Sequence, residues 1–144
     1  MSSNSLQNSQ QKHRSTCPLA IGLDFIGDRW TLLLIRDFMF FGEREYGQLL
    51  NSKEGISTNI LADRLDRLLE AGLLTKQPHP SHGRKVIYRL TKQGYKLAPA
   101  VVELLVWSAD TFGNEGVPET VRKRFKSDKK ALIDQMKNGK PLFS

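Results

Sequence analysis

The sequence predicts a mainly α-helical fold with one small β-hairpin. Apolar residues recur at helical spacing along most of the chain, as at Trp30, Leu34 and Phe38. Only the segments 73–77 and 85–90 have the character of strands, and prolines and a glycine lie between them. The chain has 144 residues, of which 39% are hydrophobic, so it is large enough to form the core of one domain.

The composition of the chain limits its partners and its compartment. Lys and Arg number 22 against 15 Asp and Glu, for a formal net charge of +7, which favours a polyanionic partner such as nucleic acid. No apolar segment approaches the roughly 20 residues that span a bilayer, and the amino-terminal residues lack the apolar region of a secretory signal. The single cysteine cannot form an internal disulfide. We therefore expect a cytoplasmic protein with no membrane partner.

The chain is expected to have three parts. Residues 1–16 are polar and of low complexity, which predicts a disordered amino-terminal arm. Residues 17–112 carry the periodic apolar pattern and are expected to form the folded domain with its dimerisation helices. Residues 113–144 form a basic extension that is expected to be partly helical. From Pro118 onward, eight Lys or Arg stand against three acidic residues, so most of the positive excess belongs to this tail.

Two helices are predicted before residue 42. Pro18 suits the first position of a helix, which places Cys17 at the N-cap, and Gly27 is suited to end that helix. Asp28 can cap the second helix. The second helix has a wide apolar face, which predicts a central place in the core.

A short helix near residues 46–50, a turn and a longer helix form the next unit. Ser57 can cap the longer helix, and Gly72 is suited to end it. Its leucines share one face, at Leu61, Leu65 and Leu68. Its polar residues share the opposite face, at Asn59, Asp63, Asp66 and Arg67.

The hairpin and a long helix complete the domain. Thr91 can cap a helix that continues to Phe112, with a kink expected at Pro99. Residues 101–107 have almost no polar face, and one small domain cannot bury that much apolar surface. We therefore expect this helix to pack against a second chain. The order of helices, hairpin and long helix predicts a winged helix-turn-helix in a dimer.

The second helix of a helix-turn-helix lies in the major groove of DNA, with its amino-terminal residues at the base edges. Asparagine can form hydrogen bonds with adenine, aspartate can accept a hydrogen bond from cytosine, and hydroxyl groups can form hydrogen bonds with several bases. The residues predicted to read bases are Ser57, Thr58, Asn59 and Asp63. A solvated helix face of an ordinary surface helix is the alternative interpretation of this pattern.

Cations beside these residues are predicted to contact the DNA backbone, which positions a protein without reading sequence. They are Arg64 and Arg67 on the same helix, and Arg84 and Lys85 in the hairpin. The hairpin cations have an alternative role as a charged turn that prevents edge-to-edge pairing of strands.

Four motifs resemble the HxlR family of bacterial transcriptional regulators. They are "CPLAIGLDFIGDRWTLLLIRD", "GISTNILADRLDRLLEAGLL", "VIYRLTKQG" and the later Trp107, and the resemblance extends from Cys17 to Phe112. It implies a homodimer that binds a palindromic operator near a promoter, usually as a repressor and sometimes as an activator. The chain departs from the family at Glu45 and Tyr46, where the family often has Arg-Phe, and in its more basic hairpin.

The helices that begin and end the domain are expected to pair two subunits. The residues predicted to form this contact are Leu19, Leu23, Ile26, Val102, Leu105 and Val106. Cys17 matches a family position that senses oxidants or electrophiles in some members. A thiol at a helix N-terminus faces free N–H groups, which favour the reactive form. The alternative is a small buried side chain that fills the packing of the first helix.

The sequence predicts neither an enzyme nor a cofactor. A metal site needs three or four ligands, whereas His79 and His82 have no carboxylate or cysteine close to them in the sequence. No phosphate-binding loop or nucleophile elbow is present in the sequence. Two other functions stay open. A protein-interaction module is favoured by the acidic residues Asp63, Asp66 and Glu70, and a scaffold that senses a small molecule or oxidant would use a pocket near the dimer seam.

Overall fold

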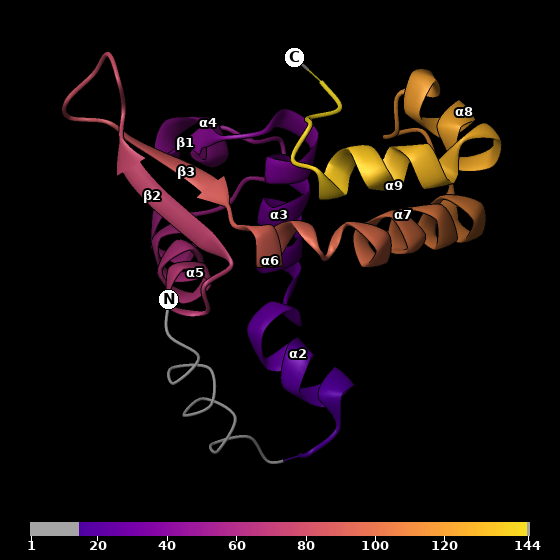
Figure 1. Ribbon diagram of the computed structural model, residues 1–144, viewed down its shortest axis with the longest axis horizontal. Helices are drawn as coiled ribbons and strands as arrows, with labels where there is room; N and C mark the ends of the chain where they lie inside the picture. Colours follow the sequence, from indigo (N-terminus) through magenta and orange to yellow (C-terminus); the bar gives the residue numbers. More distant parts are fainter. Residues whose placement is uncertain (1–14, 144) are drawn as a thin grey trace.

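The computed structural model describes residues 15–143. Over these residues the chain is mainly helical with a small antiparallel sheet, and the predicted winged helix-turn-helix fold is confirmed (Figure 1). The elements are α2 (Pro18–Ile26), α3 (Arg29–Phe41), β1 (Arg44–Glu45), α4 (Tyr46–Leu50), α5 (Thr58–Glu70), β2 (Leu74–Pro78), β3 (Val86–Leu90), α6 (Lys92–Tyr95), α7 (Ala98–Phe112), α8 (Glu119–Ser127) and α9 (Lys129–Lys137). The predicted disordered arm lies outside the described residues, except for its last two positions.

Side-chain caps fix where three of the helices begin. Asp28 before α3, Ser57 before α5 and Thr91 before α6 each accept a hydrogen bond from the N–H three residues further on, as the sequence predicts. Cys17 is at the N-cap of α2, but its side chain makes no capping hydrogen bond. Gly72 follows α5 with a φ of 75°, a conformation that glycine adopts without steric cost.

The sheet has one strand more than the predicted hairpin. β2 and β3 form that hairpin, with Leu74 opposite Leu90. The short strand β1 pairs with the other edge of β3 and places Arg44 opposite Tyr88. Two residues are too few to show a strand periodicity, so the sequence gives no signal for β1. This strand joins the hairpin to the start of the helix-turn-helix.

The expected kink at Pro99 is wrong, because the chain forms two separate helices there. α6 ends at Tyr95, and Pro99 lies in the first turn of α7. Proline is accommodated at that place because the first N–H groups of a helix have no partner within the helix. Local sequence gives the same proline signal for a kinked helix and for a new one.

The tail after Phe112 takes part in the core. Leu132 and Met136 of α9 are each 1% exposed, and α9 packs along α7 (Figure 1). Part of the apolar surface of α7 that was expected to need a second chain is therefore covered by α9 of the same chain. Val102 of α7 is fully buried within its own chain, while Trp107 remains 56% exposed.

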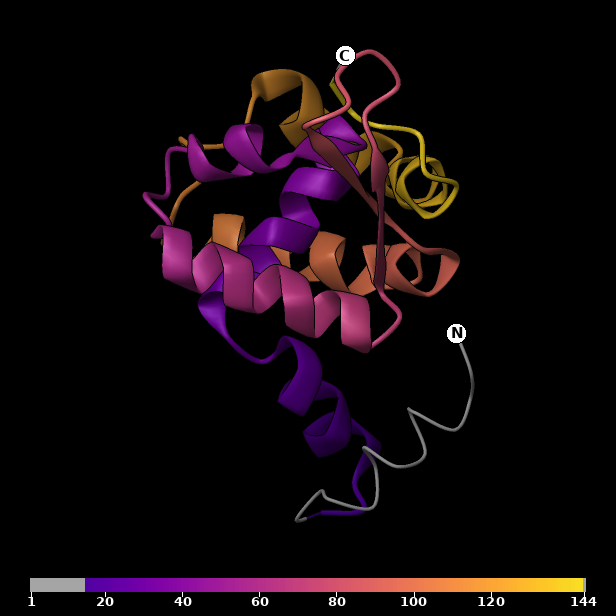
Figure 2. The same ribbon diagram turned by 90° about the vertical axis from the view of Figure 1, so that its left-hand side faces the viewer.

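The helix α2 projects from the body of the molecule (Figure 2). None of its residues is buried, and Leu19 and Leu23 are 71% and 49% exposed. Ile26, at its end, packs against the core. Within residues 15–143, no helix combines the length and the apolar character required to cross a bilayer.

Candidate nucleic-acid interface

The helix α5 is anchored from one side and open on the other. Leu61, Leu65 and Leu68 are at most 1% exposed. The four residues predicted to read bases are all exposed: Ser57, Thr58, Asn59 and Asp63. Ser57 Oγ accepts a hydrogen bond from the N–H of Ile60 at 3.3 Å. The first turn of α5 thus presents uncharged polar side chains from a helix that is held in place.

Tyr46 attaches the start of α5 to the preceding helix. Its hydroxyl donates to the carbonyl oxygen of Thr58 at 3.3 Å, while its ring packs against the core. α4 itself starts with a capping box, in which Gln48 Oε1 accepts the Glu45 N–H at 2.9 Å. The sequence indicates the apolar role of Tyr46, but a hydroxyl partner twelve residues away leaves no local signal.

Arg64 is held by acidic side chains of its own chain. Its Nε donates to the two carboxylate oxygens of Asp28 at 3.0 and 3.2 Å, and its Nη1 pairs with Asp63. Burial alone raises the pKa of Asp28, but hydrogen bonds from Thr31 and Arg64 hold that pKa below its usual value. The same hydrogen bond to Asp28 raises the pKa of Arg64. The arginine predicted to contact DNA therefore also links α5 to α3.

The acidic residues of α5 are distributed unevenly along the helix. Asp63 lies between two cations, because Arg67 Nη1 is also 3.7 Å from its carboxylate. Asp66 and Glu70 are exposed, and neither has an ion-pair partner among residues 15–143. The unpaired acidic charge is therefore in the second half of the helix, which leaves the first half as the better face for a phosphate backbone.

The wing, residues 74–90, is joined to the helix-turn-helix through Glu45. The carboxylate of Glu45 is 3.2 Å from Nε2 of His79 and 3.5 Å from Nζ of Lys85. Arg84 is exposed and has no ion-pair partner in the described part of the chain. Figure 1 shows the wing and α5 at the same end of the molecule, away from α8. The predicted backbone contacts Arg84 and Lys85 thus belong to the same end as the predicted base readers.

The predicted dimerisation residues differ in how available they are. Leu19 and Leu23 of α2 are exposed, Ile26, Leu105 and Val106 are half-buried, and Val102 lies in the core of its own chain. The large apolar residues of α7 that stay exposed are Leu104 and Trp107, within the predicted segment 101–107, and Phe112 beyond it; they are 46%, 56% and 76% exposed. The rings of Trp107 and Phe112 are in edge-to-face contact at 5.5 Å.

Cys17 is exposed at the start of α2. The alternative that this thiol is buried in the packing of the first helix is therefore wrong, since Cys17 itself is exposed in the chain. Its exposure leaves the thiol accessible to reagents in solution.

A family model and several regulators match most of the chain. The model of the HxlR-like helix-turn-helix matches residues 25–115. The HTH-type transcriptional regulator Rv3095 of Mycobacterium tuberculosis is 40% identical over 101 residues, which cover 69% of this chain and 63% of the relative. The chain thus spans less than two thirds of the length of this mycobacterial relative. The HTH-type transcriptional regulator YodB of Bacillus subtilis is 32% identical over 69% of this chain and 88% of its own.

Solved structures show the same architecture. The structure of PA1607 has a TM-score of 0.64 and 37% identity, covering 74% of this chain and 72% of that one. Reduced YodB has a TM-score of 0.57 and 28% identity, covering 68% of this chain and 96% of that one. YodB has also been solved after treatment with diamide, with a TM-score of 0.54 and 31% identity over 71% of this chain and 99% of that one.

Proposed function

The chain belongs to the HxlR-like helix-turn-helix family, as its motifs predict, and on this premise we propose that it is a sequence-specific DNA-binding transcriptional regulator of the cytoplasm. It acts as a homodimer on a palindromic operator and represses transcription, and it is not an enzyme.

The observation that carries this proposal is the first turn of α5. Leucines anchor the helix from behind, and Ser57, Thr58 and Asn59 are exposed on the open side. Uncharged side chains of this kind bond to base edges in the major groove. Asp63, Arg64 and Arg67 form an ion-paired group one turn further on. We infer that Asp63 reads a base, that Arg67 lies on phosphates, and that Arg64 contacts the backbone while it positions α5.

The wing is proposed to make the second contact with DNA. Arg84 and Lys85 are exposed at its tip, beside a turn held by Glu45. Cations placed there would lie on the phosphates next to the major groove that α5 occupies.

The homodimer follows from apolar surface that one chain leaves uncovered. Leu19 and Leu23 on α2, with Leu104, Trp107 and Phe112 on α7, are large and exposed, which is typical of a protein interface. The predicted pairing residues Ile26, Leu105 and Val106 are half-buried on the same two helices. Two copies paired in this way would place their α5 helices about one DNA turn, roughly 34 Å, apart.

One observation favours a second candidate function, a protein-interaction module. The exposed Asp66 and Glu70 have no ion-pair partner in residues 15–143 and would repel a phosphate backbone if the whole of α5 faced DNA. A basic protein partner would instead be attracted to that half of the helix.

Fluorescence anisotropy with DNA from the region upstream of the protein's own gene separates the two functions. We expect tight binding to that DNA and weak binding to a scrambled sequence. Asn59→Ala should lower this preference by about 1–3 kcal/mol, the range for one good base contact. The matched control Asn138→Ala, just after α9 and exposed, should retain the preference. Equal affinity for the two DNA molecules would favour the protein-interaction module.

The effector is proposed to include an oxidant that acts through Cys17. The thiol is exposed at the start of the helix that carries Leu19 and Leu23. A disulfide between the Cys17 thiols of two subunits would change how α2 helices pair, and with them the spacing of the two α5 helices.

A further inference from the structure

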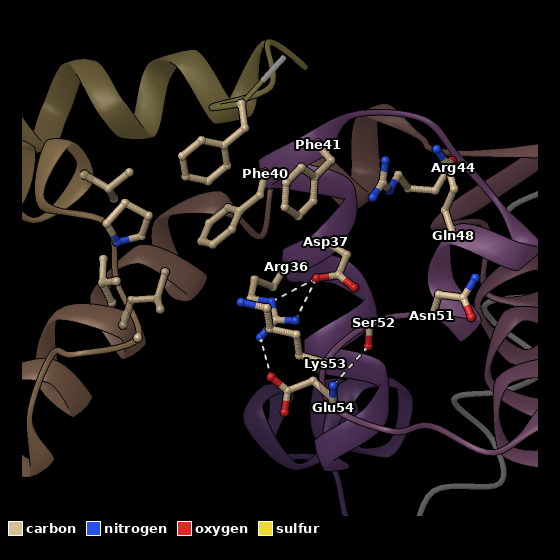
Figure 3. Close-up of a pocket in the computed structure, with 16 residues that line it drawn as sticks. Arg36, Asp37, Phe40, Phe41, Arg44, Gln48, Asn51, Ser52, Lys53 and Glu54 are labelled. Carbon is tan, nitrogen blue, oxygen red and sulfur yellow. Dashed lines mark hydrogen bonds and ion pairs between the residues drawn. The ribbon is translucent and has the colours of Figure 1, made fainter.

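A cavity lies where the C-terminal segment meets the helix-turn-helix (Figure 3). Its volume is 440 Å³, within the range of about 300–1,000 Å³ for small-molecule sites. Its apolar lining comes from parts of the chain that are far apart in sequence: Phe40, Phe41, Leu105, Val117, Val121 and Phe143.

Aromatic rings form one wall of the cavity. The Phe143 ring is 5.8 Å from that of Phe40 and 5.6 Å from that of Phe41. The Phe143 N–H also donates to the carbonyl oxygen of Phe40 at 2.9 Å, so the C-terminal segment is fixed against α3. A wall of rings provides a surface on which another flat ring can stack or pack edge-on.

Arg44 brings an unsatisfied donor to this wall. Its guanidinium carbon lies 4.7 Å from the centre of the Phe41 ring, and Figure 3 shows the side chain extending toward that ring. The Nε of Arg44 is buried and has no hydrogen-bond partner in residues 15–143. A buried charged donor without a partner is unfavourable, and a carboxylate is the acceptor that matches a guanidinium best.

The other charges around the cavity also favour an anion. The two acids that line it are already paired, since Arg36 lies 2.7 Å from Asp37 and 3.3 Å from Glu54. Lys53 lines the cavity as well and has no acidic partner in the described part of the chain. The cations that remain uncompensated are therefore Arg44 and Lys53.

We propose that this cavity binds an aromatic carboxylate. The carboxylate lies on the guanidinium of Arg44, with Lys53 nearby, and the ring packs against Phe40, Phe41 and Phe143. No covalent bond forms or breaks in the ligand or in the protein.

The position of the cavity gives this ligand a route to DNA binding, a consequence that rests on the proposed function. Residues 51–54 of its lining lead directly to Ser57, the cap of α5. Arg44 starts β1, which pairs with the wing strand β3. An occupant therefore contacts the segments that hold both DNA-contacting elements, so it should alter their relative position and the affinity for DNA.

Isothermal titration calorimetry of the full chain without DNA tests the site. The probe is 2-naphthoate, and 2-naphthalenemethanol serves as a neutral compound of the same shape. We expect the carboxylate to bind at least about tenfold more tightly than the alcohol, the size of one charge-assisted hydrogen bond. Absence of binding, or equal affinity for the two compounds, would overturn the proposal.

Two variants locate the binding within the cavity. Arg44→Met should remove the preference for the carboxylate and retain binding of the alcohol. Val117→Trp should fill the cavity and abolish both. Arg89→Met is the matched control, because Arg89 pairs with Glu43 outside the cavity, and it should bind as the wild type does. Retained preference in Arg44→Met would overturn the proposal.

Thermal unfolding identifies variants that fail to fold. If Arg44→Met does not fold, Arg44→Lys keeps the charge and loses the planar guanidinium, so the preference for the carboxylate should still fall. Anisotropy with operator DNA then measures how saturating 2-naphthoate changes the affinity for DNA. We expect a change of about fivefold or more for the wild type and no change for Val117→Trp. Because calorimetry uses no DNA, a protein that binds no DNA still gives a decisive result on the site.

Discussion

Arg64 Nε donates to both carboxylate oxygens of Asp28, at 3.0 and 3.2 Å. Asp28 is also the N-cap of α3, where it accepts the N–H of Thr31. One carboxylate thus joins the start of the central helix to the helix that we propose enters the major groove. Both side chains are about a quarter exposed, at 32% for Asp28 and 21% for Arg64, so solvent screens this ion pair only in part.

A double-mutant cycle on this pair should show coupling in stability. We expect Asp28→Asn and Arg64→Met each to lower the free energy of unfolding, and the double variant to lose less than their sum. The difference should be about 1 kcal/mol or less, as for partly exposed ion pairs. Urea denaturation measures it. Strict additivity of the two losses would show that the pair does not couple α3 to α5.

The stabilisation by Asp28 should depend on pH. Its pKa in the folded chain lies below the ordinary value of 3.8, so folding favours the charged carboxylate. The contribution is complete above about pH 3.8 and is lost as the pH falls through the lower pKa of the folded state. We therefore expect the stability difference between wild type and Asp28→Asn to be constant near neutral pH and to decrease below pH 3.8. Urea denaturation at a series of pH values measures this difference, and a difference that does not change with pH contradicts the assignment.

Arg84→Ala should weaken binding to all DNA sequences to a similar extent. If Arg84 neutralises one phosphate, its removal lowers the slope of log affinity against log salt concentration by about one unit. Anisotropy titrations at several salt concentrations give this slope. Lys137→Ala, an exposed lysine of α9 outside the wing, is the control of equal charge and should leave the slope unchanged. If both variants keep the wild-type slope, the wing is not part of the interface.

Diamide should change DNA binding by the wild type and not by Cys17→Ser. Two thiols transfer two electrons and two protons to diamide and form one disulfide, so a covalent dimer should appear on a non-reducing gel. Addition of dithiothreitol should restore both the monomer band and the original DNA affinity. Identical responses of wild type and variant would exclude Cys17 as the sensor.

Trp107→Glu should dissociate the proposed homodimer. The indole is 56% exposed and contacts the Phe112 ring, and a buried aromatic anchor at an interface contributes about 2 kcal/mol or more to association. Analytical ultracentrifugation should show a monomer at concentrations where the wild type is a dimer. Lys130→Glu, a charge reversal on the exposed face of α9, should remain dimeric. A dimeric Trp107→Glu would place the interface elsewhere.

Local chemistry explains which parts of the fold could be predicted from the sequence. The caps at Asp28, Ser57 and Thr91 involve partners three residues away, and the leucine face of α5 follows from helical spacing. The hairpin is similarly visible from its turn residues. All of these signals lie within one element, so the sequence displays them directly.

The features that the sequence does not display depend on distant partners. Arg64 and Asp28 are separated by 36 positions, and β1 exists because Arg44 and Glu45 meet β3. The uncovered face of α7 could not be delimited either, because it depends on how the distant helix α9 packs against α7, where Trp107 stays exposed. The aromatic wall of the cavity beside Arg44 is similarly completed only when Phe143 returns to α3.

The burial of Leu132 and Met136 sets the order in which a newly synthesised chain can mature. A nascent chain that has reached Phe112 contains α5 and the wing, but not the side chains that close the core above α7. Such an intermediate lacks Leu132 and Met136, which belong to the core of the complete fold, so we expect it to expose apolar surface that chaperones bind. A frameshift or early stop codon in the last part of the gene should therefore abolish accumulation of the protein, although every residue that contacts DNA would still be encoded.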